Sequence, residues 1–471
     1  MSFLSTVFLA FLAFVYAAWV LLPRRAAKRV LCAAGFAFYA YWFPPFLLVF
    51  LTSGIIDYAI SLRLPRSRRP RLVLAISILV NLGILGFFKY SNFLVTTIEQ
   101  TAAALGSPFF VDFPPILLPL GVSFYTFQSL SYTIDVYRGK LAPVRDPIDF
   151  FLFFSFFPHL VSGPILRAAN FLPQIPSSRD AAHARTLSDE DFRVFIYRLC
   201  RGYFLKAVIA DNAAHYVNAA FAGDPSRLSA VDAWLGVLCF AVQIFGDFAG
   251  YSDIAIGTAR LFGYVIPDNF NNPYCSFGIE NFWRRWHISL SSWFRDYLYI
   301  PLGGNRISPL RTEINVLLVF LVSGFWHGAN WTFIIWGGLH GLSVIAEKGV
   351  RVAFRLRIDG ARRLFLPLSV PATFVLVLIL WVPFRAQGVG QMMQYWSVMF
   401  MKAGTSLRQL PVEGVEVASL LLFALYVLIQ VSREHWKSRW LERLLLPEAI
   451  VYFTLTMLMP GPPTDFIYFQ F

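Results

Sequence analysis

The sequence predicts an all-α polytopic membrane protein, from its composition, its long apolar runs and the placement of its basic residues. Hydrophobic residues make up 57% of the 471 residues, and charged residues only 14%. A soluble domain carries about 25% charged residues, so too few charges remain to cover a water-exposed particle of this length. The whole chain, residues 1–471, is therefore expected to form a single membrane domain.

Basic residues fall in short clusters between apolar runs of about 20 residues, the length that crosses a bilayer as a helix. Clusters at residues 24–29 and 63–71 follow the first two apolar stretches. Cytoplasmic loops are enriched in Lys and Arg, so we expect these clusters in the cytoplasm and the N-terminus on the outer side of the membrane. The net charge of +13 then reflects topology and contact with membrane lipid, and nucleic-acid binding is not expected.

The apolar runs predict roughly ten to twelve crossings or part-crossings. Residues 3–22 are expected to remain as the first span, because their positive charges follow the apolar run, unlike those of a signal peptide. Residues 30–61 should cross twice and reverse at the Trp-Phe-Pro-Pro of 42–45, since proline ends a helix. Further spans are predicted at 72–88, 115–135, 194–222, 231–262, 313–326, 329–347, 364–384, 415–431 and 447–459.

Residues 148–166 are apolar but are interrupted by helix-breaking and polar residues, namely Pro158, His159, Gly163 and Pro164. Basic residues stand on both sides, which predicts a re-entrant element that begins and ends in the cytoplasm. Irregular backbone at membrane depth must be covered by protein or line a cavity, so this element is expected to line an internal cavity. The polar segment 176–193 that follows is predicted to be cytoplasmic.

Residues 281–299 have the periodicity of an amphipathic helix that begins at Asn281 as N-cap and stops at Pro301. We interpret it as an interfacial helix with arginines toward lipid headgroups. Its apolar stripe, expected to face lipid, contains Trp283, Trp286, Leu290, Trp293 and Tyr297. His287 is less well explained, because a neutral imidazole adds little to a membrane anchor, so functional and structural roles both stay open.

His327 lies at the broken centre of a predicted helical hairpin, within residues 323–331, where glycines permit close helix approach. Imidazole can take or give a proton near neutral pH, and ionisable groups beside hydrocarbon mark function by default. His327 is therefore a candidate catalytic residue, although a bond to a neighbouring carbonyl is the structural alternative. His340, further along the hairpin, fits a structural role better.

Asp247 and Asp253 lie six residues apart in a long apolar run. They could form a proton relay or an ion site, but hydrogen bonds to backbone freed by nearby glycines are the favoured interpretation. The four cysteines lack metal-ligand or CxxC spacing and are expected to be core residues: Cys32, Cys200, Cys239 and Cys275. No metal site, Walker loop, dinucleotide fingerprint or GxSxG motif is present in the sequence.

Long motifs throughout the chain resemble the membrane-bound O-acyltransferase (MBOAT) family, and within it the alginate O-acetyltransferase (AlgI-like) branch. They are LPLGVSFYTFQSLSYTIDVYRG (118–139), FFPHLVSGPILR (156–167), FGDFAGYSDIAIG (245–257), NFNNPYCSFGIENFWRRWHISLSSWFRDYLYIPLGGNR (269–306), GFWHGANWTFIIWGGLHG (324–341) and FIYFQF (466–471). The resemblance implies a funnel-shaped helical body with an internal tunnel. It would comprise N-terminal helices (1–110), a catalytic core (about 115–347) and C-terminal helices (364–471).

The resemblance also implies that His327 is the catalytic histidine inside the tunnel and that His287 occupies the second characteristic position. The implied reaction passes acetyl groups from cytoplasmic acetyl-CoA, with no tightly bound cofactor, across the bacterial inner membrane to an exported polysaccharide, most readily alginate. Basic residues near the site would bind the phosphates of the donor. The candidate donor- or substrate-binding residues are Arg284, Arg285, Ser291, Arg306, Asn330 and Trp331.

The polysaccharide would be reached directly or through a periplasmic acetyl-carrying protein partner, and the partner route is favoured because a polymer cannot easily thread to mid-membrane. D-alanyl transfer to teichoic acid and acetylation of another exopolysaccharide, such as cellulose, remain alternatives within the family. From a different class, a polysaccharide or ion transporter could use Asp247 and Asp253. A binding or scaffold protein without catalysis is the remaining alternative.

Overall fold

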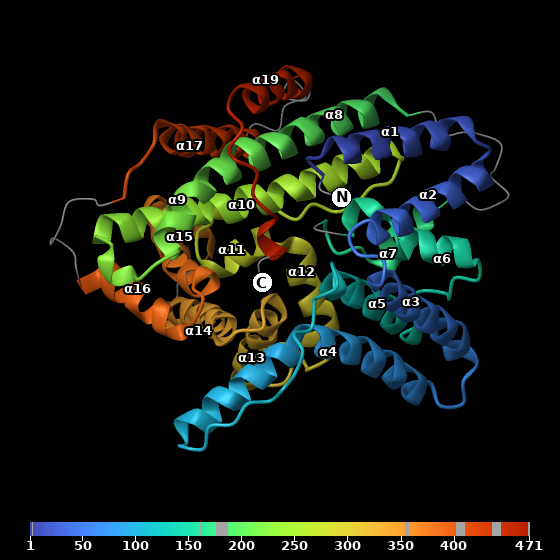
Figure 1. Cartoon of the computed structure of the whole chain (residues 1–471), viewed down its shortest axis with the longest axis horizontal. Coiled ribbons are helices and arrows are strands. Elements are labelled where there is room, and N and C mark those ends of the chain that lie inside the picture. Colours follow the sequence, from blue (N-terminus) through green and yellow to red (C-terminus); the bar gives the residue numbers. More distant parts are fainter. Residues whose placement is uncertain are drawn as a thin grey trace. The chain divides into compact units, whose positions relative to one another are not determined.

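The computed structural model describes residues 1, 3–160, 163–175, 187–353, 358–401, 410–435 and 444–469. Throughout these ranges the regular structure is helical, without β-strands (Figure 1), which confirms the predicted all-α fold. The chain forms two compact units, residues 1–195 with 255–267 and residues 196–254 with 268–471. The arrangement expected from the sequence stays a prediction. It is a single membrane domain with N-terminal helices (1–110), a catalytic core (about 115–347) and C-terminal helices (364–471).

Six helices in the described part of the chain contain a segment long and apolar enough to cross a membrane, so the protein is multi-pass. They are α3 (Phe46–Arg63), α4 (Pro70–Ala104), α10 (Ala230–Leu261), α13 (Pro309–His327), α15 (Ile358–Arg385) and α17 (Gly414–His435). Two more apolar helices, α1 (Thr6–Leu21) and α19 (Leu445–Leu458), are shorter. The remaining predicted crossings fall on helices that are too short or too polar to meet the same criterion.

The first unit contains α1, α2 (Arg24–Ala40), α3, α4, α5 (Val122–Tyr137), α6 (Pro147–Phe154), α7 (Ala168–Phe171) and the start of α8 (Asp189–Tyr203). The chain breaks between α2 and α3 at residues 41–45, where the two prolines were expected to end the helix. Helix α4 extends well beyond the predicted 72–88. Helix α4 begins at Pro70, since proline suits the first turn of a helix. It ends just before Gly106, whose positive φ of +78° is typical of the residue that follows a helix.

A buried carboxylate ties three helices of the first unit together. Asp57 on α3 accepts hydrogen bonds from Ser77 Oγ (2.6 Å) and Asn81 Nδ2 (2.8 Å) on α4, and from Ser129 on α5. A buried charge is costly unless it is hydrogen-bonded. This network therefore specifies how the three helices pack, and the apolar periodicity of the sequence does not reveal it.

In the interrupted segment 148–166, the described residues 148–160 and 163–166 are mostly buried and their helix is broken, in agreement with the sequence. Helix α6 ends at Phe154, a 3-10 turn follows at Phe157–His159, and His159 Nε2 lies 3.1 Å from Gln128 Oε1 on α5. Its re-entrant course through the membrane stays a prediction. Of the polar segment 176–193, residues 176–186 lie outside the described ranges, and α8 begins at Asp189.

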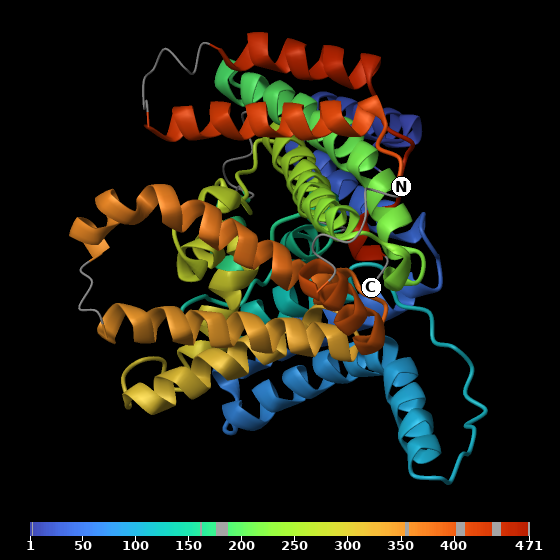
Figure 2. The same ribbon diagram turned by 90° about the vertical axis from the view of Figure 1, so that its left-hand side faces the viewer.

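The second unit contains the rest of α8, the π-helical turn Phe204–Ala210, α9 (Asp211–Phe221), most of α10, and the helices after residue 268. The latter are α11 (Ile279–Arg285), α12 (Ile288–Phe294), α13, α14 (Trp331–Ala353), α15, α16 (Val389–Met401), α17 and α19. Helices α13 and α14 form the expected hairpin and lie side by side (Figures 1 and 2).

The prediction of one amphipathic helix over 281–299 is wrong. The segment forms two short helices, α11 and α12, broken at Trp286–His287, and then a π-helical turn at Arg295–Tyr299. Gly278, not Asn281, occupies the N-cap position. The tryptophan stripe is buried inside the protein instead of facing lipid, with Trp283, Trp286 and Trp293 between 1% and 9% exposed. An apolar stripe must be covered, but periodicity alone does not say whether lipid or protein covers it.

Candidate active site

The structure brings the two predicted histidines together in the second unit. His287 lies at the break between α11 and α12, His327 is the last residue of α13, and their ring centroids are 6.3 Å apart. Both are buried, at 0% and 3% exposure. Two imidazole rings at this separation are close enough for both to contact one small group.

His287 is held in a left-handed backbone conformation, with φ +42° and ψ +56°. A residue other than glycine held there costs about 1–3 kcal/mol and persists only when its surroundings impose it. Asn269 supplies that constraint, because its carbonyl accepts from Ile288 N (2.9 Å) and its side-chain Oδ1 accepts from Ser289 Oγ (2.6 Å). Strained residues of this kind cluster at functional sites.

The His287 ring is surrounded by aromatic side chains. Phe248 on α10 meets it edge-on at a centroid distance of 4.6 Å, and Trp326 lies at 6.2 Å. Neither ring nitrogen makes a hydrogen bond within the described protein. Burial lowers the pKa of His287 to about 3, so the ring is neutral at physiological pH and presents one donor and one acceptor nitrogen. Buried polar atoms normally have partners, which suits a ring that binds a substrate group.

His327 is enclosed by aromatic rings from several segments of the second unit. The centroid distances are 4.9 Å to Trp326, 5.0 Å to Trp336 on α14, 5.4 Å to Phe384 on α15 and 5.8 Å to Tyr468 near the C-terminus. Such walls leave little room for water beside the His327 ring, and a neutral imidazole can accept a proton in catalysis.

The hairpin that carries His327 depends on glycines. A Cβ on Gly324 would lie 2.2 Å from the Phe333 carbonyl oxygen, and one on Gly337 would lie 2.2 Å from the Phe320 carbonyl oxygen. Helices α13 and α14 can therefore approach closely only because these positions lack a side chain. The close approach agrees with the role predicted for the glycines near His327, which was to let two helices pack closely.

His340 has a different environment from the two site histidines. Its Nδ1 accepts from Trp283 Nε1 at 3.2 Å, and its ring packs against Trp336 and Phe282. These contacts fit the structural role expected of it.

Two of the three predicted donor-binding arginines, Arg284 and Arg285, are engaged in ion pairs. Arg284 pairs with Glu280 at 2.5 Å and is 71% exposed, while Arg285 pairs with Glu434 at 3.0 Å. Arg306 is exposed. A phosphate group would compete with the glutamates for the first two side chains, so their role as donor-binding residues stays a prediction.

The three remaining candidates are Ser291, Asn330 and Trp331, and the first two make hydrogen bonds within the protein. Ser291 Oγ donates to the Trp286 carbonyl at 3.3 Å. The Asn330 side chain precedes α14 and makes two hydrogen bonds. It accepts one from Thr332 N (3.0 Å) in the first turn of α14, and it donates one to the Gln387 carbonyl (2.9 Å). Trp331 is 49% exposed. The contacts of Ser291 and Asn330 are structural, and substrate binding by the three residues stays a prediction.

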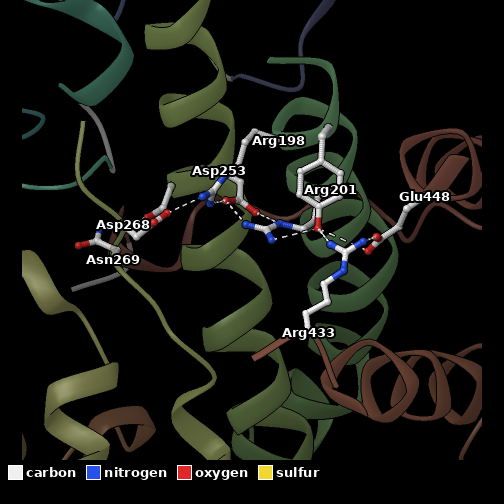
Figure 3. Close-up of polar contacts among 9 residues, drawn as sticks. Arg198, Arg201, Asp253, Asp268, Asn269, Arg433 and Glu448 are labelled. Atoms are coloured by element: carbon white, nitrogen blue, oxygen red, sulfur yellow. Dashed lines mark hydrogen bonds and ion pairs between the residues drawn. The ribbon is translucent and has the colours of Figure 1, made fainter. Parts of the chain in front are cut away.

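Asp253 belongs to an ion network within the second unit (Figure 3). Its carboxylate pairs with Arg198 (2.6 Å) and Arg201 (2.5 Å), and Arg198 also pairs with Asp268 at 2.7 Å. The network continues through Tyr197, Arg433 and Glu448. A carboxylate held between two guanidinium groups is poorly suited to carry protons, which favours a structural role for Asp253 over a relay. Its hydrogen-bond partners are arginine side chains, not the backbone groups that the sequence suggested.

Asp247 is also paired. Lys206, in the π-helical turn, places its Nζ 2.9 Å from Asp247 Oδ1 and 2.8 Å from Asp211 Oδ1. Sequence reasoning did not single out Lys206, although a lone lysine in the apolar run 204–210 is a signal that could have identified it. Phe248 and Tyr468, which touch the two histidines, carried no such signal because aromatic residues are abundant in this chain.

The chain belongs to the membrane-bound O-acyltransferase family, because residues 142–382 match the sequence profile of that family. The chain is therefore a membrane-embedded O-acyltransferase, which confirms the resemblance seen in the motifs.

The chain is similar to bacterial acetylation enzymes over most of its length. It is 40% identical to the probable alginate O-acetylase AlgI of Azotobacter vinelandii, over 92% of this chain and 84% of that protein. The probable alginate O-acetylase AlgI of Pseudomonas aeruginosa is also 40% identical, over 90% and 80% of the two chains. The peptidoglycan O-acetyltransferase of Helicobacter pylori is 34% identical, over 83% and 76%.

Proposed function

We propose that this protein transfers acetyl groups from cytoplasmic acetyl-CoA across the bacterial inner membrane for O-acetylation of an exported polysaccharide, with alginate as the polymer. The observation that carries the proposal is the buried pair of His287 and His327 inside aromatic walls. The extensive similarity to alginate O-acetylases supports acetyl as the group and alginate as the acceptor.

His327 acts as general base in the proposed reaction. Its neutral imidazole takes the proton of an acceptor hydroxyl while the hydroxyl oxygen attacks the thioester carbonyl carbon of the donor. Collapse of the tetrahedral intermediate breaks the carbon–sulfur bond, and the imidazolium returns the proton to the departing thiolate. Atoms and charges balance without a further reactant. A general base of this kind contributes about 10²–10⁴-fold in rate.

His287 stabilises or orients the reacting carbonyl in this scheme. A ring N–H aimed at the carbonyl oxygen would stabilise the negative charge that develops there, and a fixed donor needs no reorganisation during the reaction. The strained backbone of His287 supports such a role, because it fixes the ring in place.

The site suits acetyl better than D-alanyl. The rings that surround His327 belong to Trp326, Trp336, Phe384 and Tyr468. None of these four side chains carries an acid to pair with the ammonium group of D-alanine, whose burial without a counter-charge is costly. An acetyl group is uncharged and carries no such cost.

A periplasmic protein that accepts the acetyl group would link this buried site to the polymer. The histidines are almost completely covered, and a polysaccharide chain is too bulky to reach them by itself. The acceptor hydroxyl at His327 would then belong to a partner or to a mobile group it presents. The proposed orientation places the N-terminus in the periplasm and the basic clusters in the cytoplasm.

The test is complementation of an alginate-producing strain that lacks its own alginate O-acetylase, with the acetyl content of secreted alginate as the readout. We expect the parent protein to restore acetylation and His327→Ala and His327→Gln to abolish it. His340→Gln is the matched control, since it is the same substitution at a buried histidine of the same hairpin. Membrane-fraction protein levels are compared throughout.

Near-normal acetylation by well-inserted His327→Gln would refute the proposed base. Parallel measurement of peptidoglycan O-acetylation separates the polymers, because one relative acts as a peptidoglycan O-acetyltransferase. Restored peptidoglycan acetylation with unacetylated alginate would keep the chemistry and overturn the acceptor.

A further inference from the structure

The C-terminal segment, residues 459–469, runs from α19 back into the interior of the second unit (Figure 1). Phe466 and Ile467 are buried, at 0% and 1% exposure. The Tyr468 ring lies 5.8 Å from His327 and 5.0 Å from Phe248, the residue that packs on His287. The C-terminal segment thus forms one wall of the histidine site.

A buried cluster of charges holds this segment. The Lys206 cluster consists of Lys206, Asp211 and Asp247, whose side chains are 0–2% exposed. Lys206 Nζ donates to the Thr464 carbonyl at 2.9 Å and to Thr464 Oγ1 at 3.1 Å. Thr464 Oγ1 in turn donates to Asp211 Oδ1 at 2.5 Å. Lys206 and Asp211 therefore bind Thr464 directly, and Asp247 is connected to Thr464 through Lys206.

The cluster also reaches the residue next to Tyr468. Asp247 uses one carboxylate oxygen for Lys206 and the other to accept from the backbone N–H of Ile467, at 2.6 Å. A charge-assisted hydrogen bond to a backbone group is about twice as strong as a neutral one. Asp247 therefore fixes the Phe466–Ile467 peptide, one residue before Tyr468, and so constrains the placement of the Tyr468 ring beside His327.

Close packing of α10 allows the cluster to form. A Cβ on Gly250 would lie 3.1 Å from Lys206 N, and one on Gly246 would lie 2.8 Å from the Leu205 carbonyl oxygen. The π-helical turn Phe204–Ala210 can lie against α10 only because these two positions are glycine. Single π-helical turns are rare and occur often at functional sites.

Stability alone gives a weak reason for this arrangement. Replacing a buried ion pair by well-packed apolar residues is often neutral or stabilising, because the desolvation of two charges offsets their attraction. Charged groups whose hydrogen bonds have fixed directions can instead hold a segment in one position. In this protein the Lys206 cluster holds the C-terminal segment, which contacts the candidate base His327.

We propose that Lys206, Asp211 and Asp247 are positioning residues for acyl transfer, which hold the C-terminal segment so that Tyr468 packs against His327. The inference rests on the proposed function of His327. Release of the segment would move an aromatic wall of the site and admit water, and a misplacement of about 1 Å can cost about 10²-fold in rate.

The test compares Lys206→Met and Asp247→Asn with Asp253→Asn in the purified full-length protein. Asp253 is a matched control, since it lies on the same helix, is buried, and pairs with Arg198 and Arg201 instead of the C-terminal segment. We expect the first two variants to lower kcat for acetyl-CoA turnover by about 10–10²-fold, with a much smaller change in KM. Asp253→Asn should lower thermal stability without a comparable loss of kcat per folded molecule.

A cysteine at Ile467 reports the position of the segment, in a background with the native cysteines replaced. Because Ile467 is 1% exposed, Ile467→Cys should resist a maleimide in the parent and react when Lys206→Met is added. If Lys206→Met does not accumulate, Thr464→Val removes the hydroxyl contacts from the segment side. A released segment with unchanged kcat, or an equal kcat loss in Asp253→Asn, would overturn the positioning role.

His327→Ala separates this inference from the proposed function. Full turnover by His327→Ala would refute the proposed function itself. An inactive His327→Ala combined with an active, maleimide-reactive Lys206→Met would refute only the role of the Lys206 cluster.

Discussion

At the scale of single residues, the backbone of His287 is the clearest sign of a constructed site. Asn272 and His287 are the two non-glycine residues with positive φ in the described chain. The position favours glycine or asparagine, yet it holds a histidine whose ring nitrogens make no hydrogen bond within the described protein. A residue kept against its conformational preference indicates that its side chain is needed there.

The strain at His287 predicts an unusual order of stability for two truncated variants. His287→Gly and His287→Ala leave nearly the same cavity. The difference between their free energies of unfolding therefore measures the cost of the left-handed backbone at this position. The glycine variant should be more stable than the alanine variant by about 1 kcal/mol, because only glycine adopts φ +42° without a Cβ clash. Both variants should lose acetylation.

Thermal unfolding in detergent measures the difference, followed with a thiol-reactive dye that reports exposure of the buried Cys32 and Cys239. A melting temperature of His287→Ala equal to or above that of His287→Gly would contradict the left-handed backbone at this position.

At the scale of elements, the α13–α14 hairpin shows how helix packing sets the position of the base. His327 ends α13, and the glycines of α13 and α14 allow the two backbones to come within van der Waals contact. A displacement of α13 relative to α14 would therefore move His327. The rate of the reaction should therefore depend on residues that touch no substrate.

Three alanine substitutions in the hairpin test this dependence. Gly324→Ala and Gly337→Ala each place a Cβ 2.2 Å from a backbone oxygen of the opposite helix. We expect a lower melting temperature and about a 10²-fold loss of activity, because the helices must separate. Gly338→Ala is the control, since its Cβ would meet only Leu321 Cδ2 at 3.4 Å, and alanine favours the helix by about 1 kcal/mol. Equal effects at all three positions would argue against close packing as the cause.

At the scale of the whole molecule, the basic clusters determine a topology that activity assays do not test. If the clusters at 24–29 and 63–71 are cytoplasmic, acetyl-CoA enters from the side on which it is made. The orientation of the enzyme and the identity of its donor are thus linked.

Cysteine labelling of intact cells tests the orientation of the protein in the membrane. The native cysteines are replaced in this experiment too. A cysteine at Ser67, within the second basic cluster, should be protected from an impermeant thiol reagent until the membrane is permeabilised. A cysteine at Asp224, on the exposed loop between α9 and α10, should react in intact cells. The reverse pattern would invert the topology and place the donor on the wrong side.

The sequence by itself determined the membrane character, the all-helical class, the breaks at prolines, the family and the two histidines. These features are local, because charge content, apolar run length and motif identity need no knowledge of contacts. The prediction failed at 281–299, where the same periodicity fits lipid or protein as the covering surface, and only burial showed that protein covers the tryptophans.

Only the tertiary structure placed His287 6.3 Å from His327 and joined Lys206 to Asp247 and the C-terminal segment. These contacts join residues far apart in the chain, on elements whose approach depends on glycines and on compensated buried charges. Local periodicity carries no information about such approach, since it records which face of a helix is apolar and not which partner covers that face.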